Sequence, residues 1–161
     1  MASRPPPEEH LDPRATTLWR LSGLLQIVPF VIAIVAGAVG LIWFDLLSTP
    51  IVVVVAAAIV LLLAIATWVI PGLVWKYWRY EIGEANVDIQ HGWLTTTRTV
   101  IPMARIQHVD TRHGPLQRRF GLASVVLYTA AGASQIPALA DEIATSARDR
   151  IAALANVHDD L

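Results

Sequence analysis

The sequence predicts a membrane helical hairpin followed by a small antiparallel β domain that a C-terminal helix covers. Three observations predict this class. Two long stretches, 21–44 and 51–75, carry no charged residue. Short segments of alternating polar and apolar residues follow from Trp78, separated by frequent turn residues. The last part of the chain repeats apolar residues at helical spacing.

The composition indicates that the apolar residues are concentrated in one region. Of 161 residues, 55% are hydrophobic and only 16% are charged, whereas a soluble domain usually has about a quarter charged residues. Within 21–75 the single charge is Asp45, which excludes a plain soluble globule and a disordered chain. The net charge of −1 argues against a basic polyanion binder. The lack of Cys excludes disulfides, Cys-ligated zinc and thiol catalysis.

Each apolar stretch is long enough to cross a bilayer as a helix. A helix of about 24 residues spans roughly 36 Å, and the hydrocarbon core is about 30 Å thick. Asp45, Ser48 and Pro50 predict a short turn between the two stretches rather than one long helix. A cleaved signal peptide is the alternative, because 36–38 resembles a cleavage site, but the apolar stretch continues past it and favours an uncleaved anchor.

Positive charges at the ends of the stretches predict the topology. Arg14 and Arg20 precede the first stretch, Lys76 and Arg79 follow the second, and the loop between them has no Lys or Arg. The positive-inside rule then puts both termini in the cytoplasm. The residues predicted to lie at the membrane interface are Trp75, Lys76, Tyr77, Trp78 and Arg79.

Four segments are predicted along the chain. They are a disordered cytoplasmic tail over 1–20, the transmembrane hairpin over 21–75, a cytoplasmic β domain over 76–156 and a C-terminal tail over 157–161. Six or seven short strands in the β domain predict a small antiparallel barrel or sandwich. The final helix is predicted to cover an open end of it, with the membrane surface as the alternative position. Its apolar face is predicted to comprise Leu139, Ile143, Ala147, Ile151 and Leu154.

One segment, 114–121, predicts a helix of one or two turns. Gly114 permits a tight turn, Pro115 suits the first helical position and Gly121 suits the C-terminal cap. Leu116 and Phe120 lie four residues apart and are predicted to anchor in the core. The residues predicted to face elsewhere are Gln117, Arg118 and Arg119.

The order of these motifs resembles that of the bacterial pleckstrin-homology (PH) membrane proteins, in the small YdbS-like branch. The resemblance covers about 15–156. Its motifs are Arg79-Tyr80, Gly92-Trp93-Leu94, Ile101-Pro102-x-x-Arg105-Ile106-Gln107, Gly114-Pro115-Leu116-Gln117-Arg118-x-Phe120-Gly121 and Thr129-Ala130-x-Gly132. Two positions depart from the family pattern, which often has Tyr at Met103 and Gly at Ala138.

The resemblance implies a PH-like fold, a strongly bent seven-stranded antiparallel barrel that a C-terminal helix closes. It also implies a multi-pass protein of the bacterial plasma (inner) membrane. The family is not known for enzymes, and some members are encoded beside a larger membrane protein with several PH-like domains.

Residue patterns typical of catalysis and metal binding are missing from the sequence. The five His form no His-x-x-x-His or Glu-x-x-His pattern. Gly-x-Ser-x-Gly, P-loop and Gly-x-Gly-x-x-Gly motifs do not occur either. We therefore expect no catalytic residue, no cofactor and no metal site, and a protein that is not an enzyme.

The charge of the β domain is uneven. The segment 98–119 carries five Arg and one Asp, a net charge of +4. Three interpretations remain open: local ion pairing on a solvated face, contact with anionic lipid headgroups, and docking to an acidic patch on a protein. The candidate lipid or partner contacts are Arg105, Gln107, Arg112, Arg118 and Arg119. Nucleic acid is not expected, because the soluble half is neutral in total and shows no recognition helix.

The sequence favours a non-enzymatic interaction scaffold in the cell envelope. The expected partners are membrane lipids and either a second copy of the chain or a larger PH-domain membrane protein. The alternatives are an anionic-lipid surface reader and an accessory subunit of an enzyme or transport complex. Phosphoinositide recognition is not expected, because the turn of the first hairpin, 83–86, is acidic.

Overall fold

A computed structural model describes residues 5–159 and divides the chain into two compact units. One unit is the apolar hairpin, Trp19–Gly72. The other joins the described residues up to Leu18 with those from Leu73 onward. The second unit is therefore assembled from both flanks of the hairpin.

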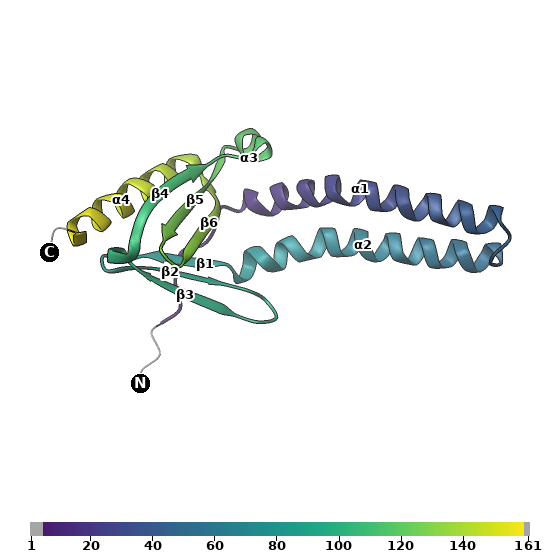
Figure 1. Ribbon diagram of the computed structural model, residues 1–161, viewed down its shortest axis with the longest axis horizontal. Helices are drawn as coiled ribbons and strands as arrows, with labels where there is room; N and C mark the ends of the chain where they lie inside the picture. The colour runs from purple at the N-terminus through teal and green to yellow at the C-terminus, as the bar shows by residue number, and fades with distance from the viewer. Residues whose placement is uncertain (1–4, 160–161) are drawn as a thin grey trace. The chain divides into compact units, whose positions relative to one another are not determined.

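Two long helices form the hairpin, α1 (Arg14–Trp43) and α2 (Thr49–Tyr77) (Figure 1). Both are long and apolar enough to cross a membrane, and many of their large apolar side chains are exposed. The Val- and Ile-rich start of α2 is helical rather than extended, because only a helix satisfies its own backbone groups in lipid. Helix α1 begins where Asp12 Oδ1 accepts a hydrogen bond from the Arg14 backbone N–H, at 2.8 Å.

The two helices pack closely at one level of the hairpin. A Cβ added at Gly23 would lie 2.8 Å from Cγ2 of Thr67, so the missing side chain allows this approach. Nearby, Arg20 Nε donates a hydrogen bond to the Trp68 carbonyl at 3.1 Å, and its guanidinium lies 4.7 Å from the centre of the Trp68 ring. A Trp and an Arg together are typical of a membrane interface.

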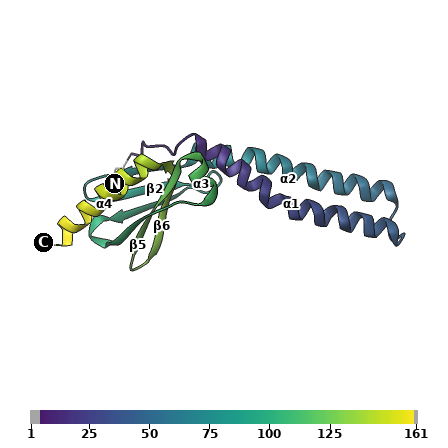
Figure 2. The same cartoon turned by 90° about the horizontal axis from the view of Figure 1, so that it is seen from above.

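The second unit contains two three-stranded antiparallel sheets (Figures 1 and 2). The first has the order β1 (Arg79–Ile82), β2 (Asn86–His91), β3 (Thr97–Pro102). The second has the order β4 (Ile106–Arg112), β5 (Leu122–Thr129), β6 (Gly132–Ala140). The helical segments are the 3₁₀ turn η1 (Met103–Arg105), α3 (Pro115–Phe120) and α4 (Asp141–Asp159).

The core of this unit is centred on β5. Every residue from Leu122 to Leu127 is buried, so both faces of the strand are covered, and α3 and α4 both contact it. The predicted apolar face of the last helix is partly wrong, because the helix begins at Asp141 and Leu139 belongs to β6. The buried face of α4 is Ala144, Ala147 and Ile151, whereas Ile143 is 52% exposed.

The PH-like sandwich with a covering helix is confirmed, but the described residues contain six strands, and the sheets do not close into a barrel. At the free edge of β1, Glu9 forms an isolated antiparallel bridge with Tyr80. The described residues 5–20 thus differ from the expected disordered tail, since Leu11 and Ala15 are also buried. The expected C-terminal tail differs as well, since α4 continues to Asp159; residues 1–4 and 160–161 lie outside the described part.

Candidate functional site

The α3 segment explains much of the Gly-Pro-Leu-Gln motif. Pro115 occupies the first turn, and Gly121 adopts a left-handed φ of 63° as the C-terminal cap. Gln117 is half-buried rather than directed outward: its Oε1 accepts a hydrogen bond from the Gly114 N–H, and its Nε2 donates one to Ser124 Oγ, both at 2.8 Å. The amide therefore ties α3 to β5, and the motif is structural at this position.

Arg98 forms an ion pair with a buried carboxylate, so its charge is not available to bind a lipid or a partner protein. Its Nε lies 3.1 Å from both carboxylate oxygens of Asp88, and its Nη2 lies 2.6 Å from Oδ2. The Asp88 carboxylate raises the pKa of the Arg98 guanidinium, mainly through these hydrogen bonds. For this residue, local ion pairing is the correct interpretation.

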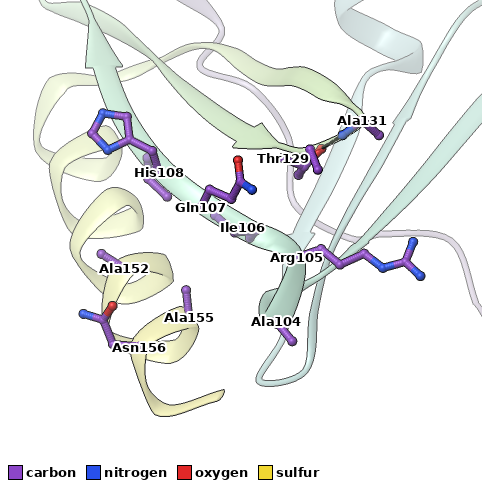
Figure 3. A pocket seen from close by; sticks show the side chains of 12 residues that line it. Ala104, Arg105, Ile106, Gln107, His108, Thr129, Ala131, Ala152, Ala155 and Asn156 are labelled. Carbon is purple, nitrogen blue, oxygen red and sulfur yellow. Dashed lines mark hydrogen bonds between the residues drawn. The ribbon is translucent and has the colours of Figure 1, made fainter. Parts of the chain in front are cut away.

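A groove of about 790 Å³ lies where the start of β4 meets the end of α4 and the β5–β6 turn. Figure 3 shows the side chains that line it. They come from η1 and β4 (104–109), from the turn (129–131), and from Ala152, Ala155 and Asn156 of α4. Two of the five candidate contacts, Arg105 and Gln107, line this groove.

The wall that β4 contributes is a strand edge. Side chains of a strand alternate between its faces, so a groove along one face would be lined by every second residue. Here four successive residues of β4, 106–109, line it, together with Ala104 and Arg105 of η1. The register of β4 against β5 shifts between Ile106 and His108, so Gln107 has no partner residue in β5.

Cationic and amide groups supply the polar chemistry of the groove. Within residues 5–159, the Arg105 side chain is exposed and makes no hydrogen bond or ion pair. The His108 Nε2 lies 2.7 Å from Asp110 Oδ1. Farther along β4, Arg112 donates a hydrogen bond to the Tyr128 hydroxyl. The groove lining thus includes an uncompensated positive charge at Arg105 and no carboxylate.

The three remaining candidate contacts, Arg112, Arg118 and Arg119, lie outside the groove. Arg118 and Arg119 are exposed on α3, and among the described residues their guanidinium groups have no hydrogen-bonding or ionic partner. The Phe120 carbonyl at the end of α3 accepts a hydrogen bond from Arg14 Nη1 at 3.0 Å. The structure therefore does not gather the five candidates into a single site.

Several residues predicted to lie at the membrane interface make protein contacts instead of remaining free. Trp75 Nε1 donates a hydrogen bond to the Leu11 carbonyl at 3.0 Å, and the Trp78 ring stacks on His91 at 4.7 Å. Arg79 Nη1 donates to the Lys76 and Trp78 carbonyls. Lys76 and Tyr77 are exposed.

The N-terminal segment packs beside these aromatic residues. The His10 and Trp75 rings lie 5.6 Å apart. Partial burial and the charge of Arg79 lower the pKa of His10. Burial, and secondarily the nearby Glu9, raises the pKa of Tyr80. In both residues, the surroundings favour the neutral form of the side chain.

Comparisons with known proteins agree with this architecture. Residues 22–155 match the family described as Bacterial PH domain. The chain belongs to the bacterial PH domain family. It is similar to the UPF0699 transmembrane protein YdbS of Bacillus subtilis (strain 168), with 39% identity over 159 residues that cover 98% of each chain. No solved structure matches the chain.

Of the residues that line the groove of this bacterial PH domain protein, sequence reasoning named only Arg105 and Gln107 as candidate contacts. The helical pattern predicted only a covering helix and did not indicate that Ala152, Ala155 and Asn156 line a groove. The signal was the pair of small residues one turn apart, which leaves space beside a helix. Among the described residues, no group of three His, Cys, Asp or Glu is placed to hold a metal ion.

Proposed function

We propose that this membrane protein is a non-enzymatic interaction scaffold whose PH-like domain binds a protein partner at the cytoplasmic face of the bacterial plasma membrane. The partner is a second copy or a larger membrane protein with PH-like domains. The observation that supports this is the groove at β4, an open surface with an unpaired strand edge, amide groups and a free guanidinium. Such a surface offers recognition groups rather than a reaction centre.

The bridge between Glu9 and Tyr80 supports the proposed topology. These residues flank the two apolar helices, and their backbones exchange hydrogen bonds of 3.1 and 3.0 Å. Backbones paired in this way lie on one side of a membrane, which favours an even number of crossings by the helices between them. The Arg and Lys residues on both flanks favour the cytoplasmic side. A reporter fused after Leu161 should be active in the cytoplasm; activity only outside would refute the topology.

The scaffold proposal is tested by purifying the intact chain in a mild detergent. We expect a second membrane protein to copurify in a fixed ratio, or light scattering to show an oligomer of the chain itself. A monomer that retains no partner in several detergents and after crosslinking in membranes would contradict the proposal. A stoichiometric catalytic or transport subunit would instead favour the accessory-subunit alternative.

A lipid-contacting role is the second candidate, and Arg118 and Arg119 favour it. They are adjacent, exposed and unpaired within the described residues. Each Lys or Arg near an anionic surface contributes about 1 kcal/mol. Hydrogen exchange of α3 in nanodiscs tests it: anionic lipid should protect this segment compared with zwitterionic lipid, and the double variant R118Q/R119Q should lose the difference. Equal exchange in both lipids would exclude this role.

A further inference from the structure

We propose that the groove at β4 binds an extended, acidic segment of a partner protein, which adds as a strand to the free edge of β4. This inference rests on the proposed function, since it names the surface and the chemistry by which a protein partner is held. The groove lining, the strand order and the charge of Arg105 each support one part of it.

The first part is the open edge. In the described part of the chain, β4 pairs with β5 alone, and β5 continues the sheet to β6. An edge strand presents alternating N–H and C=O groups that another strand can pair with. Four successive residues of β4, 106–109, line the groove, next to Ala104 and Arg105 of η1. At about 3.3 Å per residue, these four residues offer a binding length of roughly 13 Å.

The second part is the fit to a peptide rather than to a lipid headgroup. A lipid headgroup does not present donors and acceptors that alternate at the spacing of a strand, whereas a peptide backbone pairs with both the N–H and the C=O groups of a strand edge. The side-chain amides of Gln107 and Asn156 likewise donate and accept. On the α4 side, the groove is lined by the small side chains of Ala152 and Ala155.

The third part is the charge of the ligand. Arg105 is exposed and unpaired among the described residues, and the groove lining has no carboxylate that could neutralise it. His108 already pairs with Asp110. A Glu or Asp of the bound segment would therefore meet Arg105, which fixes the register of the added strand.

The test selects peptides from a displayed library of random twelve-residue sequences on the full chain in mild-detergent micelles. A parallel selection on the Ala155→Trp variant, whose new side chain fills the groove, identifies peptides that bind elsewhere on the protein or the micelle. We expect the enriched peptides to have β-branched residues at alternate positions, to contain Glu or Asp, and to lack proline. Hydrogen exchange should show that the best peptide protects amides of 104–109.

Charge variants provide matched controls for the selected peptide. Arg105→Glu should weaken its binding at least tenfold, while Arg118→Glu, the same change outside the groove, should change it less than twofold. A peptide of equal charge with a central proline should bind at least tenfold more weakly. If the Ala155→Trp chain loses its circular dichroism signal, Ala152→Leu replaces it as the groove-filling variant.

The inference would be overturned by no enrichment over the filled groove, by enrichment of basic or proline-rich peptides, or by an equal loss with Arg118→Glu. Contact between Arg105 and anionic lipid in nanodiscs, without peptide selection, would assign the groove to lipid instead. A partner that copurifies equally with Ala155→Trp would retain the scaffold function and refute this binding surface.

Discussion

Removal of Arg98 should destabilise the β domain, because it would leave the Asp88 carboxylate buried without its partner. The Asp88 side chain is 3% exposed and that of Arg98 is 28% exposed. Breaking a buried pair by removing one member costs about 3–5 kcal/mol. Partial access of water to the Arg98 position favours the lower end, so Arg98→Ala should reduce the free energy of unfolding by about 3 kcal/mol.

Hydrogen exchange of β2 and β3 amides, measured on the full chain in micelles, reports this free energy without unfolding the hairpin. Arg112→Ala is the matched control, since its exposed side chain contacts Tyr128 rather than a buried charge, and it should cost at most about 1 kcal/mol. The double variant D88L/R98L should recover much of the loss, because it removes both charges. A loss below about 1 kcal/mol for Arg98→Ala, or no recovery in the double variant, would refute the reasoning.

Three further predictions follow from local packing and protonation. Gly23→Leu should destabilise the hairpin by about 1–3 kcal/mol in detergent unfolding measurements, because the new side chain would meet Thr67. Gly37→Leu has open space and should change the free energy of unfolding by no more than about 0.5 kcal/mol. Equal effects of the two substitutions would contradict this prediction. Gln117→Ala should destabilise the β domain by about 1–3 kcal/mol, because Ser124 Oγ and the Gly114 N–H lose their hydrogen-bond partner. Hydrogen exchange of the full chain in micelles measures this change, and an unchanged pattern of amide protection would contradict the prediction. Acidification from pH 7 to 5 should loosen the N-terminal segment, because the pKa of His10 is lower in the folded chain than in the unfolded chain. The stabilisation that neutral His10 contributes is present above the unfolded pKa of about 6.5 and is lost as the pH falls through the folded pKa. Proteolysis near residue 10 should rise accordingly in the wild type but not in His10→Asn, and identical pH profiles would refute this.

Local patterns in the sequence predicted the elements that depend on nearby residues. The length of the apolar stretches gave the hairpin, and Pro115 and Gly121 gave the limits of α3. The family departure at Ala138 also marks a local feature, because this residue has a left-handed φ of 50°, which glycine adopts more easily.

Contacts between distant segments could not be predicted. Arg98 looked like one of a row of solvated cations, because nothing in the sequence indicates that Asp88 is buried beside it. The tail around Glu9 was polar and rich in proline, yet a backbone bridge to Tyr80 and the burial of Leu11 order it. The groove likewise depends on the approach of α4 to β4, which only the fold defines.

The joining of Glu9 to Tyr80 and of Arg14 to Phe120 has a consequence for biosynthesis. The ribosome makes the first member of each pair long before the second, and both apolar helices are translated in between. The segment that contains Glu9 and Arg14 therefore stays in water, without its partners, until both helices are inserted and the β domain has been synthesised. Damage to them would halt a late step of maturation, so that inserted but incompletely folded chains accumulate.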